Sequence, residues 1–444
     1  MNNPSGGLIL KIKSIHINNL LSINNEEFIF PEPHVNYFGD LKISIIVGEN
    51  GTCKTSLLKF LAESFLYPHI RSKNIRDYEK GFKINYEIHG REAYIEENHP
   101  SFKDSTGHVP KENVALMPSN IIVSTTALNG KFANVSREIN NIKYIYTGPL
   151  KSTRATIFRA LMDKELEKPV QRLLELMRYS KEYRIIMPDE EILLKRIRQN
   201  AYRLGFLNED VLQNFLTVHT KISSQYKGSK RLRAIYHGQI NTFWLETIEK
   251  IMEARVNVDF QLEIFSLTHN EWINSTDMSS GEQAMFDRFF PLLKLVKNNS
   301  LVLIDEPETH LHPRWLKQYV FILSQLFSSF KAHIIVATHS PLIAADVPND
   351  CIIGLVKCLE TGNIKQYNIN KSTLGGNQPS ILNDVFRLDI QTGSFTNLII
   401  GRIKECMKNG EKEKALDMFN DLGTTVNKYS LYNELMELFP EEFK

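Results

Sequence analysis

The sequence predicts an α/β fold, in which a mixed sheet with flanking helices carries a helical insertion and ends in a helical tail. Three observations support this fold class. Short β-branched runs and a glycine-rich loop precede a helical pattern near the start of the chain. A helical period of three and four residues then takes over, and an alternation of strands and helices returns later. We expect the regions to be 1–150, 151–256, 257–370 and 371–444.

The first region reads as strands around one helix. LKIKSIHI alternates polar and apolar residues, and EFIF follows a polar turn at Asn24 and Asn25. The β-branched run 43–47 ends at Gly48, and apolar residues spaced as in a helix continue to Phe65. Further strand-like runs are FKINYEI, AYIEE, IIVST and KYIYT. This region therefore predicts a sheet with a helix directly after one of its strands.

Helices dominate the second region, and alternation returns in the third. We expect helices in four segments of the second region, 154–178, 190–204, 211–219 and 239–252. The third region then gives, in order, strand VDFQLEIF, a helix from about Gly281, strand LVLID, a helix over 315–327 and strand HIIVAT. Short amphipathic helices with stop signals at Asn409-Gly410 and Gly423 are expected in the tail.

Composition excludes several classes of protein. The chain has 444 residues with a net charge of +2, which argues against a histone-like protein or an acidic disordered chain. No apolar run reaches the roughly 18 residues that span a bilayer, and no secretory signal is recognisable at the N-terminus. Four irregularly spaced cysteines form neither a disulfide framework nor a paired zinc motif. We therefore expect a cytoplasmic protein with no membrane partner.

The segment GENGTCKT, placed between a predicted strand and a predicted helix, is the strongest local signal. Turn amides and a helix N-terminus can bind phosphate oxygens, with Lys54 at the β- and γ-phosphates and the Thr55 hydroxyl on Mg²⁺. Cys53 stands where a glycine is usual. The alternative is an ordinary strand–turn–helix junction. The candidate nucleotide-binding residues, called the phosphate loop below, are Gly48, Glu49, Asn50, Gly51, Thr52, Cys53, Lys54, Thr55 and Ser56.

Two acidic residues end the apolar strand LVLIDE. The carboxyl edge of a sheet would bring Asp305 and Glu306 next to the phosphate loop. Asp305, with Thr55, is a candidate Mg²⁺ ligand, and Glu306 is a candidate catalytic carboxylate that orients or deprotonates the attacking water. Such a strand end also occurs often by chance.

Two further motifs flank this strand. MSSGEQ precedes a predicted helix, where small residues leave amides open to an anion, although a serine N-cap with an acid in the first turn explains the same residues. The candidate anion-binding residues, called the signature residues below, are Ser279, Ser280, Gly281 and Glu282. ATHSP follows a later strand, and its His339 is placed to contact the γ-phosphate or the attacking water.

In this order, the four motifs resemble an ATP-binding-cassette (ABC) ATPase head of the branch that holds SMC proteins, RecF-type repair proteins and bacterial defence ATPases. The resemblance covers residues 8–150 and 257–370. It implies a P-loop ATPase that binds ATP and Mg²⁺ and pairs with a second copy. In such a pair, the signature residues of one copy contact the γ-phosphate of the ATP that is bound to the phosphate loop of the other copy. His312 stands at the position of the family's D-loop aspartate, and the segment after Ile122 has no glutamine for the Q-loop.

The insertion indicates which kinds of partner the protein could bind. With about 105 residues, the insertion is too short for a cohesin-like coiled coil, and it has no CxxC zinc hook. Residues 151–255 hold 20 Lys and Arg against 13 Asp and Glu, a local charge of +7. Five basic residues of the insertion are candidate contacts to the phosphates of DNA or RNA: Lys221, Lys227, Lys230, Arg231 and Arg233. Alternatively, they form a solvated face or a surface that docks a protein.

The tail has no DxD carboxylate pair, so a fused Toprim nuclease is not expected. Its LGGNQPSILNDVF run is similar to Septu-type defence ATPases, including retron-associated ones, which act beside a separate HNH nuclease. The resemblance therefore implies an ATPase that senses phage infection and regulates such a nuclease. A RecF-like DNA-repair ATPase and a slow-turnover nucleotide switch are the alternatives.

Overall fold

The computed structural model describes residues 10–66, 81–96, 99–104, 106, 116–125, 132, 136–139, 142–148, 160–254, 256, 258–388, 393–423 and 426–440. Contacts divide the chain into two compact units, Met1–Ile381 and Leu382–Lys444. Among these residues, no helix combines the length and the apolar character needed to cross a bilayer.

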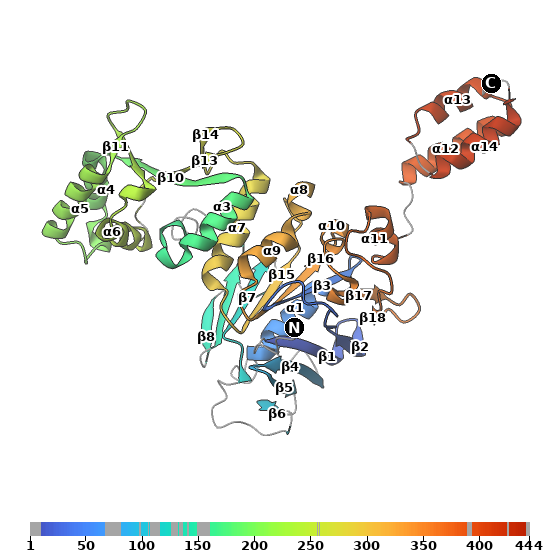
Figure 1. Cartoon of the computed structure of the whole chain (residues 1–444), viewed down its shortest axis with the longest axis horizontal. Helices are drawn as coiled ribbons and strands as arrows, with labels where there is room; N and C mark the ends of the chain where they lie inside the picture. The colour runs from blue at the N-terminus through green and yellow to red at the C-terminus, as the bar shows by residue number, and fades with distance from the viewer. Residues whose placement is uncertain are drawn as a thin grey trace, which may run out of the picture. The chain divides into compact units, whose positions relative to one another are not determined.

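An eight-stranded sheet forms the centre of the first unit, in the order β18-β17-β3-β16-β15-β7-β9-β8 (Figure 1). Its strands are β3 (Leu41–Gly48), β7 (Asn120–Thr125), β8 (Arg137–Ile139), β9 (Ile142–Thr147), β15 (Ser300–Asp305), β16 (Ala332–Thr338), β17 (Ile352–Lys357) and β18 (Ile364–Tyr367). Six strands are parallel, and the edge strands β18 and β8 are antiparallel. Every residue of β3, β15 and β16 is buried, as expected for parallel strands covered on both faces. The predicted mixed sheet is thus confirmed.

Several helices precede or follow these strands in the chain. They are α1 (Lys54–Leu66), α7 (Ser280–Leu295), α8 (Pro313–Leu316), α9 (Tyr319–Phe327), α10 (Pro341–Ala344) and α11 (Gln378–Asp384). Helix α1 follows β3 and packs against β3, β15 and β16 through apolar residues such as Leu57, Leu61 and Phe65. Because β3, β15 and β16 are adjacent and parallel, their carboxyl ends meet at one edge beside the start of α1.

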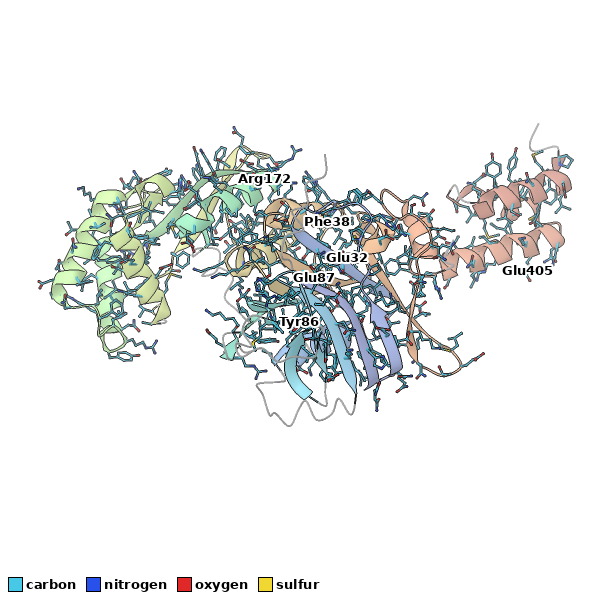
Figure 2. All side chains as sticks on the ribbon, turned by 60° about the horizontal axis from the view of Figure 1, so that its bottom comes forward. Glu32, Phe38, Tyr86, Glu87, Arg172 and Glu405 are labelled. Carbon is cyan, nitrogen blue, oxygen red and sulfur yellow. The ribbon has the colours of Figure 1, made fainter. Side chains whose placement is uncertain are left out.

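An antiparallel sheet of order β2-β1-β4-β5-β6 packs on the same core. Its strands are β1 (Lys11–Leu20), β2 (Ile23–Ile29), β4 (Phe82–Ile88), β5 (Arg91–Glu96) and β6 (His99–Asp104). Tyr86 of β4, labelled in Figure 2, packs edge-on against Phe65, and its hydroxyl donates to the carbonyl of Leu116. Buried Lys42 donates to the carbonyls of Ile12 and Phe30, so polar bonds as well as apolar contacts join the two sheets.

The described part of the second predicted region, residues 160–254 and 256, contains a helix at each expected segment, but it also contributes strands. Residues 154–159 of the expected helix 154–178 lie outside the described residues. Its helices are α3 (Glu167–Leu176), α4 (Glu190–Gln199), α5 (Glu209–Ile222) and α6 (Thr242–Glu253). Between them lie β10 (Tyr179–Pro188), β11 (Ser224–Gln225) and β12 (Leu232–Tyr236), which the sequence did not indicate. Strand β10 shows no alternation because its last six residues are all buried.

These strands join β13 (Gln261–Ser266) and β14 (Glu271–Asn274) in an antiparallel sheet of order β11-β12-β10-β13-β14. A buried ion pair links its middle strands, with Nη2 of Arg184 2.6 Å from Oε2 of Glu263. The boundary expected at residue 256 therefore falls inside one sheet.

The second unit contains α12 (Ser394–Lys408), α13 (Lys412–Asn420) and α14 (Val426–Leu438). A small core holds them together, formed by Ile403, Met407, Ala415, Phe419, Leu431 and Leu435. The tail is helical, as predicted, and α12 ends immediately before the stop signal at Asn409-Gly410.

Candidate active site

The phosphate loop connects the end of β3 to the first turn of α1. Gly48 is required by close approach, because an added Cβ would lie 2.5 Å from the carbonyl oxygen of Leu355 and 2.7 Å from Oγ1 of Thr52. Thr52 Oγ1 donates to the Glu49 carbonyl at 2.8 Å, which closes the turn. The amides at the start of α1 give this loop the partial positive charge that binds anions.

Cys53 has a φ of +59°, in the left-handed region that favours glycine. Its half-buried side chain packs against the apolar core under the loop. The loop thus keeps a backbone conformation typical of glycine while it carries a Cβ at this position.

Lys54 is the first residue of α1, and its ammonium group is enclosed. Its Nζ donates to the carbonyls of Gly48 at 2.9 Å and Glu49 at 3.0 Å, and it lies 3.4 Å from Nδ1 of His339. Burial lowers the pKa of Lys54 to about 8, although nearby carboxylates, Glu308 first among them, act in the opposite direction. The structure therefore brings together Lys54 and His339, both of which the sequence analysis assigned to the γ-phosphate.

Thr55 and Asp305 also meet, since Oγ1 of Thr55 donates to Oδ1 of Asp305 at 3.0 Å. Burial raises the pKa of Asp305 to about 6, the hydrogen bond from Thr55 opposes this rise, and the charges of Glu306 and Glu308 add to it. A hydroxyl and a carboxylate are oxygen ligands that suit Mg²⁺. This pair could hold such an ion at the edge of the sheet.

Glu306 follows β15 with a φ of +49°, again in the left-handed region, and its amide donates to the carbonyl of Ala337 at 2.9 Å. A non-glycine residue in this conformation stores strain of about 1–3 kcal/mol. The turn begins directly after Asp305, so both candidate carboxylates leave the same strand end.

His339 is half-buried at the end of β16. Burial, followed by the charge of Lys54, lowers its pKa to about 4. The imidazole is therefore neutral near pH 7 and adds no charge next to Lys54.

Glu308 is a site residue that the sequence analysis missed. Its Oε2 accepts from Oγ1 of Thr338 at 2.8 Å, and its Oε1 accepts from the amide of His339 at 2.5 Å. Burial raises the pKa of its carboxyl group. Glu308 thus fixes the backbone of His339. The available signal was a third acid in the run DEPE.

The signature residues lie at the N-terminus of α7, a different helix from the one that carries Lys54. Ser279 is the N-cap and forms a capping box with Glu282: its Oγ donates to Oε2 of Glu282 at 2.8 Å and accepts from the amide of Glu282 at 3.3 Å. Oε1 of Glu282 accepts from the hydroxyl of Tyr179, on β10, at 2.8 Å. The capping interpretation is therefore realised, and Tyr179 is a neighbour that the sequence did not indicate.

His312 caps α8, where its Nδ1 accepts from the amide of Arg314 at 3.2 Å. It thus has a local structural role at the position of the D-loop aspartate.

The basic candidates lie between the end of α5 and β12. Lys227, Lys230 and Arg231 are exposed, and Nζ of Lys227 lies 5.0 Å from the ring centre of Tyr226. Arg233 instead donates through Nε to Oγ of Ser223 at 3.0 Å, which ties β12 to the end of α5. Lys221, in the last turn of α5, is exposed as well. Lys227, Lys230 and Arg231 form an exposed basic surface, while Arg233 already serves the local fold.

Parts of this chain are similar to known proteins. A family model described as "AAA domain, putative AbiEii toxin, Type IV TA system" matches residues 169–346. Protein ea59 of Escherichia phage lambda is 34% identical over 122 residues, which cover 28% of this chain and 23% of ea59. The Septu protein PtuA of Bacillus thuringiensis is 25% identical over 153 residues, which cover 34% of this chain and 38% of PtuA. The matches thus span well under half of either relative.

Two solved structures also align with this chain. The Smc head domain of Pyrococcus furiosus with an extended coiled coil, bound to the C-terminal domain of ScpA, aligns with a TM-score of 0.36 and 14% identity, over 81% of this chain and 96% of that one. The recombination mediator protein RecF with ATP aligns with a TM-score of 0.32 and 12% identity, over 82% of this chain and 100% of that one.

Proposed function

We propose that this chain is an ABC-type P-loop ATPase, which binds ATP and Mg²⁺ at the phosphate loop and hydrolyses ATP to ADP and phosphate. The observation that carries this proposal is the convergence of Lys54, Thr55, Asp305 and His339, from two strand ends and a helix N-terminus, on one edge of the central sheet. Charged and hydroxyl groups enclosed at a helix N-terminus suit a triphosphate with a divalent cation.

Each of these residues has a chemical role in the proposed reaction. Loop amides and the ammonium of Lys54 neutralise the β- and γ-phosphates, and Thr55 and Asp305 would hold Mg²⁺, which supplies further charge neutralisation at these phosphates. Glu306 accepts a proton from water as the water oxygen attacks the γ-phosphorus, and the bond to the ADP oxygen breaks. Neutral His339, fixed by Glu308, contacts the γ-phosphate or the attacking water. Cys53 slows this turnover.

Two copies pair around ATP in this proposal. The signature residues of one copy contact the γ-phosphate that the phosphate loop of the other holds. Ser279 and Ser280, which are exposed at the N-terminus of α7, support this role because the first amides of a helix can bind an anion.

The test compares two site variants with a matched control. Lys54→Ala should abolish ATP binding, because it removes the enclosed cation. Glu306→Gln should keep ATP binding and accumulate an ATP-bound dimer, because the proton acceptor is lost while the phosphate contacts remain. Exposed Glu360→Gln is the control and should match the parent in binding, phosphate release and sedimentation. Hydrolysis at the parent rate by Glu306→Gln would show that another group accepts the proton.

The biological role that we propose is that of a cytoplasmic sensor that regulates a separate, HNH-type nuclease during phage infection. The match to the Septu protein PtuA and to a family described as a putative AbiEii toxin supports it. The purified chain, incubated with plasmid, single-stranded DNA or RNA and Mg²⁺ or Mn²⁺, should cut none of them. Cleavage that Asp305→Ala abolishes would contradict the need for a partner.

A RecF-like role in DNA repair is the second candidate, favoured by the basic surface of Lys227, Lys230 and Arg231. Neighbouring genes separate the two roles, since an adjacent HNH gene supports defence and adjacent replication genes support repair.

A further inference from the structure

Arg288 is a buried cation with few partners. It lies on α7, the helix that begins at the signature residues, and its residue exposure is only 4%. Its Nη2 donates to the carbonyl oxygen of Thr309. Within the described part of the chain, its Nε and Nη1 have no hydrogen-bond partner. The nearby hydroxyl of Tyr319, on α9, is likewise buried and unpaired among these residues.

Such an arrangement does not favour stability. A guanidinium group removed from water and bonded to one neutral carbonyl retains a desolvation cost of several kcal/mol. Replacement of buried charges by apolar residues of similar volume is often neutral or stabilising. A packing role alone would therefore be filled better by an apolar side chain at this position.

The carbonyl that Arg288 holds belongs to the segment that carries the hydrolytic carboxylates. Thr309 lies in the loop between β15 and α8, and its amide donates to the carbonyl of Glu306 at 3.3 Å. Glu308 precedes it and accepts from Thr338 and from the amide of His339. Movement of the Thr309 carbonyl would therefore displace both Glu306 and the support of His339.

We propose that Arg288 is a positioning residue for ATP hydrolysis: through the Thr309 carbonyl, it fixes the loop that carries Glu306 and Glu308, and so joins the helix of the signature residues to the hydrolytic side of the site. This inference rests on the proposed ATPase function. It assigns no contact between Arg288 and the nucleotide.

Arg288→Met, which keeps an unbranched side chain of roughly similar volume and removes the hydrogen bond, is the main variant. We expect kcat to fall by about 10- to 100-fold, the effect of a small displacement of reacting groups, while KM for ATP changes by less than about twofold. Arg288→Lys keeps one charged donor and should give an intermediate kcat. Lys294→Met, on the exposed face of the same helix, is the control and should match the parent.

Hydrogen exchange of the protein without nucleotide gives a second readout, independent of hydrolysis. The amide of His339 and the segment 306–312 should exchange faster in Arg288→Met and less so in Arg288→Lys. Parent kcat and parent exchange in Arg288→Met would overturn the proposal. If the parent itself hydrolyses no ATP, the proposed function fails, and exchange alone decides the role of Arg288. If Arg288→Met does not fold, Arg288→Lys is the test. A reduced kcat with faster exchange supports the proposal, and parent values of both overturn it.

Discussion

Replacement of Cys53 by glycine tests whether the side chain in the phosphate loop limits turnover. The φ of +59° makes a Cβ unfavourable by about 1–2 kcal/mol, which glycine would relieve. Loss of the half-buried CH₂–SH group costs about 1 kcal/mol, and the added freedom of glycine in the unfolded chain costs about 0.5–1 kcal/mol. These contributions nearly cancel, so the free energy of unfolding should change by less than about 1 kcal/mol, a Tm shift of about 4 °C or less.

Turnover should respond more clearly than stability. If about 1 kcal/mol of the relieved strain is realised in the transition state, kcat rises about fivefold. Phosphate release at saturating Mg²⁺ and ATP measures this, together with calorimetry. Cys53→Ala, which keeps the Cβ, should stay at the parent rate, and so should Leu21→Gly, which relieves a φ of +54° in the turn between β1 and β2. An unchanged kcat in Cys53→Gly would refute the reasoning, and an equal rise in Cys53→Ala would assign the effect to the thiol.

Three further predictions concern the metal pair, the signature residues and the basic surface. Burial raises the pKa of Asp305 to about 6, so below this pH a proton competes with Mg²⁺ for the carboxylate. The gain in ATP affinity that Mg²⁺ provides should therefore fall about tenfold per pH unit below pH 6. A gain that titration calorimetry finds constant from pH 8 to pH 5 would contradict this. Tyr179→Phe removes the hydrogen bond to Glu282, so it should lower the free energy of unfolding by about 1 kcal/mol. It should also weaken the ATP-dependent dimer without changing ATP affinity. An unaltered dimerisation constant in sedimentation would show that Tyr179 does not support the signature residues. Replacing Lys227, Lys230 and Arg231 with Glu should weaken binding to single- or double-stranded nucleic acid and flatten its salt dependence, and unchanged anisotropy across a salt series would assign these residues to a solvated face.

The sequence alone predicts those parts of the site whose residues lie close together in the chain or at the ends of neighbouring parallel strands. Gly48 and Lys54 belong to one short turn between a strand and a helix, so their proximity needs no long-range information. The meeting of Thr55 with Asp305, 250 residues apart, was predictable as well, because parallel strands place their carboxyl ends at one edge. Five strands of the central sheet, β3, β7, β9, β15 and β16, were foreseeable because each contains a run of aliphatic or aromatic residues, whereas β8, β17 and β18 were not expected.

Other features depend on neighbours that no local pattern specifies. Glu308 could not be distinguished from an ordinary surface acid, since its role depends on Thr338, which the fold brings next to it. Arg288 resembles any charged residue of an amphipathic helix until its burial is known. Strand β10 was missed because burial on both faces removes the alternation that identifies a half-exposed strand.

The three contacts of the Lys54 ammonium have a consequence for affinity. An ammonium group has three donor hydrogens, and Nζ of Lys54 has three acceptors nearby, one for each hydrogen. They are the carbonyls of Gly48 and Glu49 and Nδ1 of His339. A phosphate oxygen that approaches Lys54 must therefore exchange with one of these internal acceptors. Binding is then a replacement reaction, in which a charge-assisted bond to phosphate takes the place of a bond to a neutral carbonyl or imidazole, so the net gain is smaller than the strength of the new bond alone. The first amides of α1, which have no partner within the helix, give up no such bond when they bind a phosphate oxygen, so their contribution to affinity is not reduced in this way.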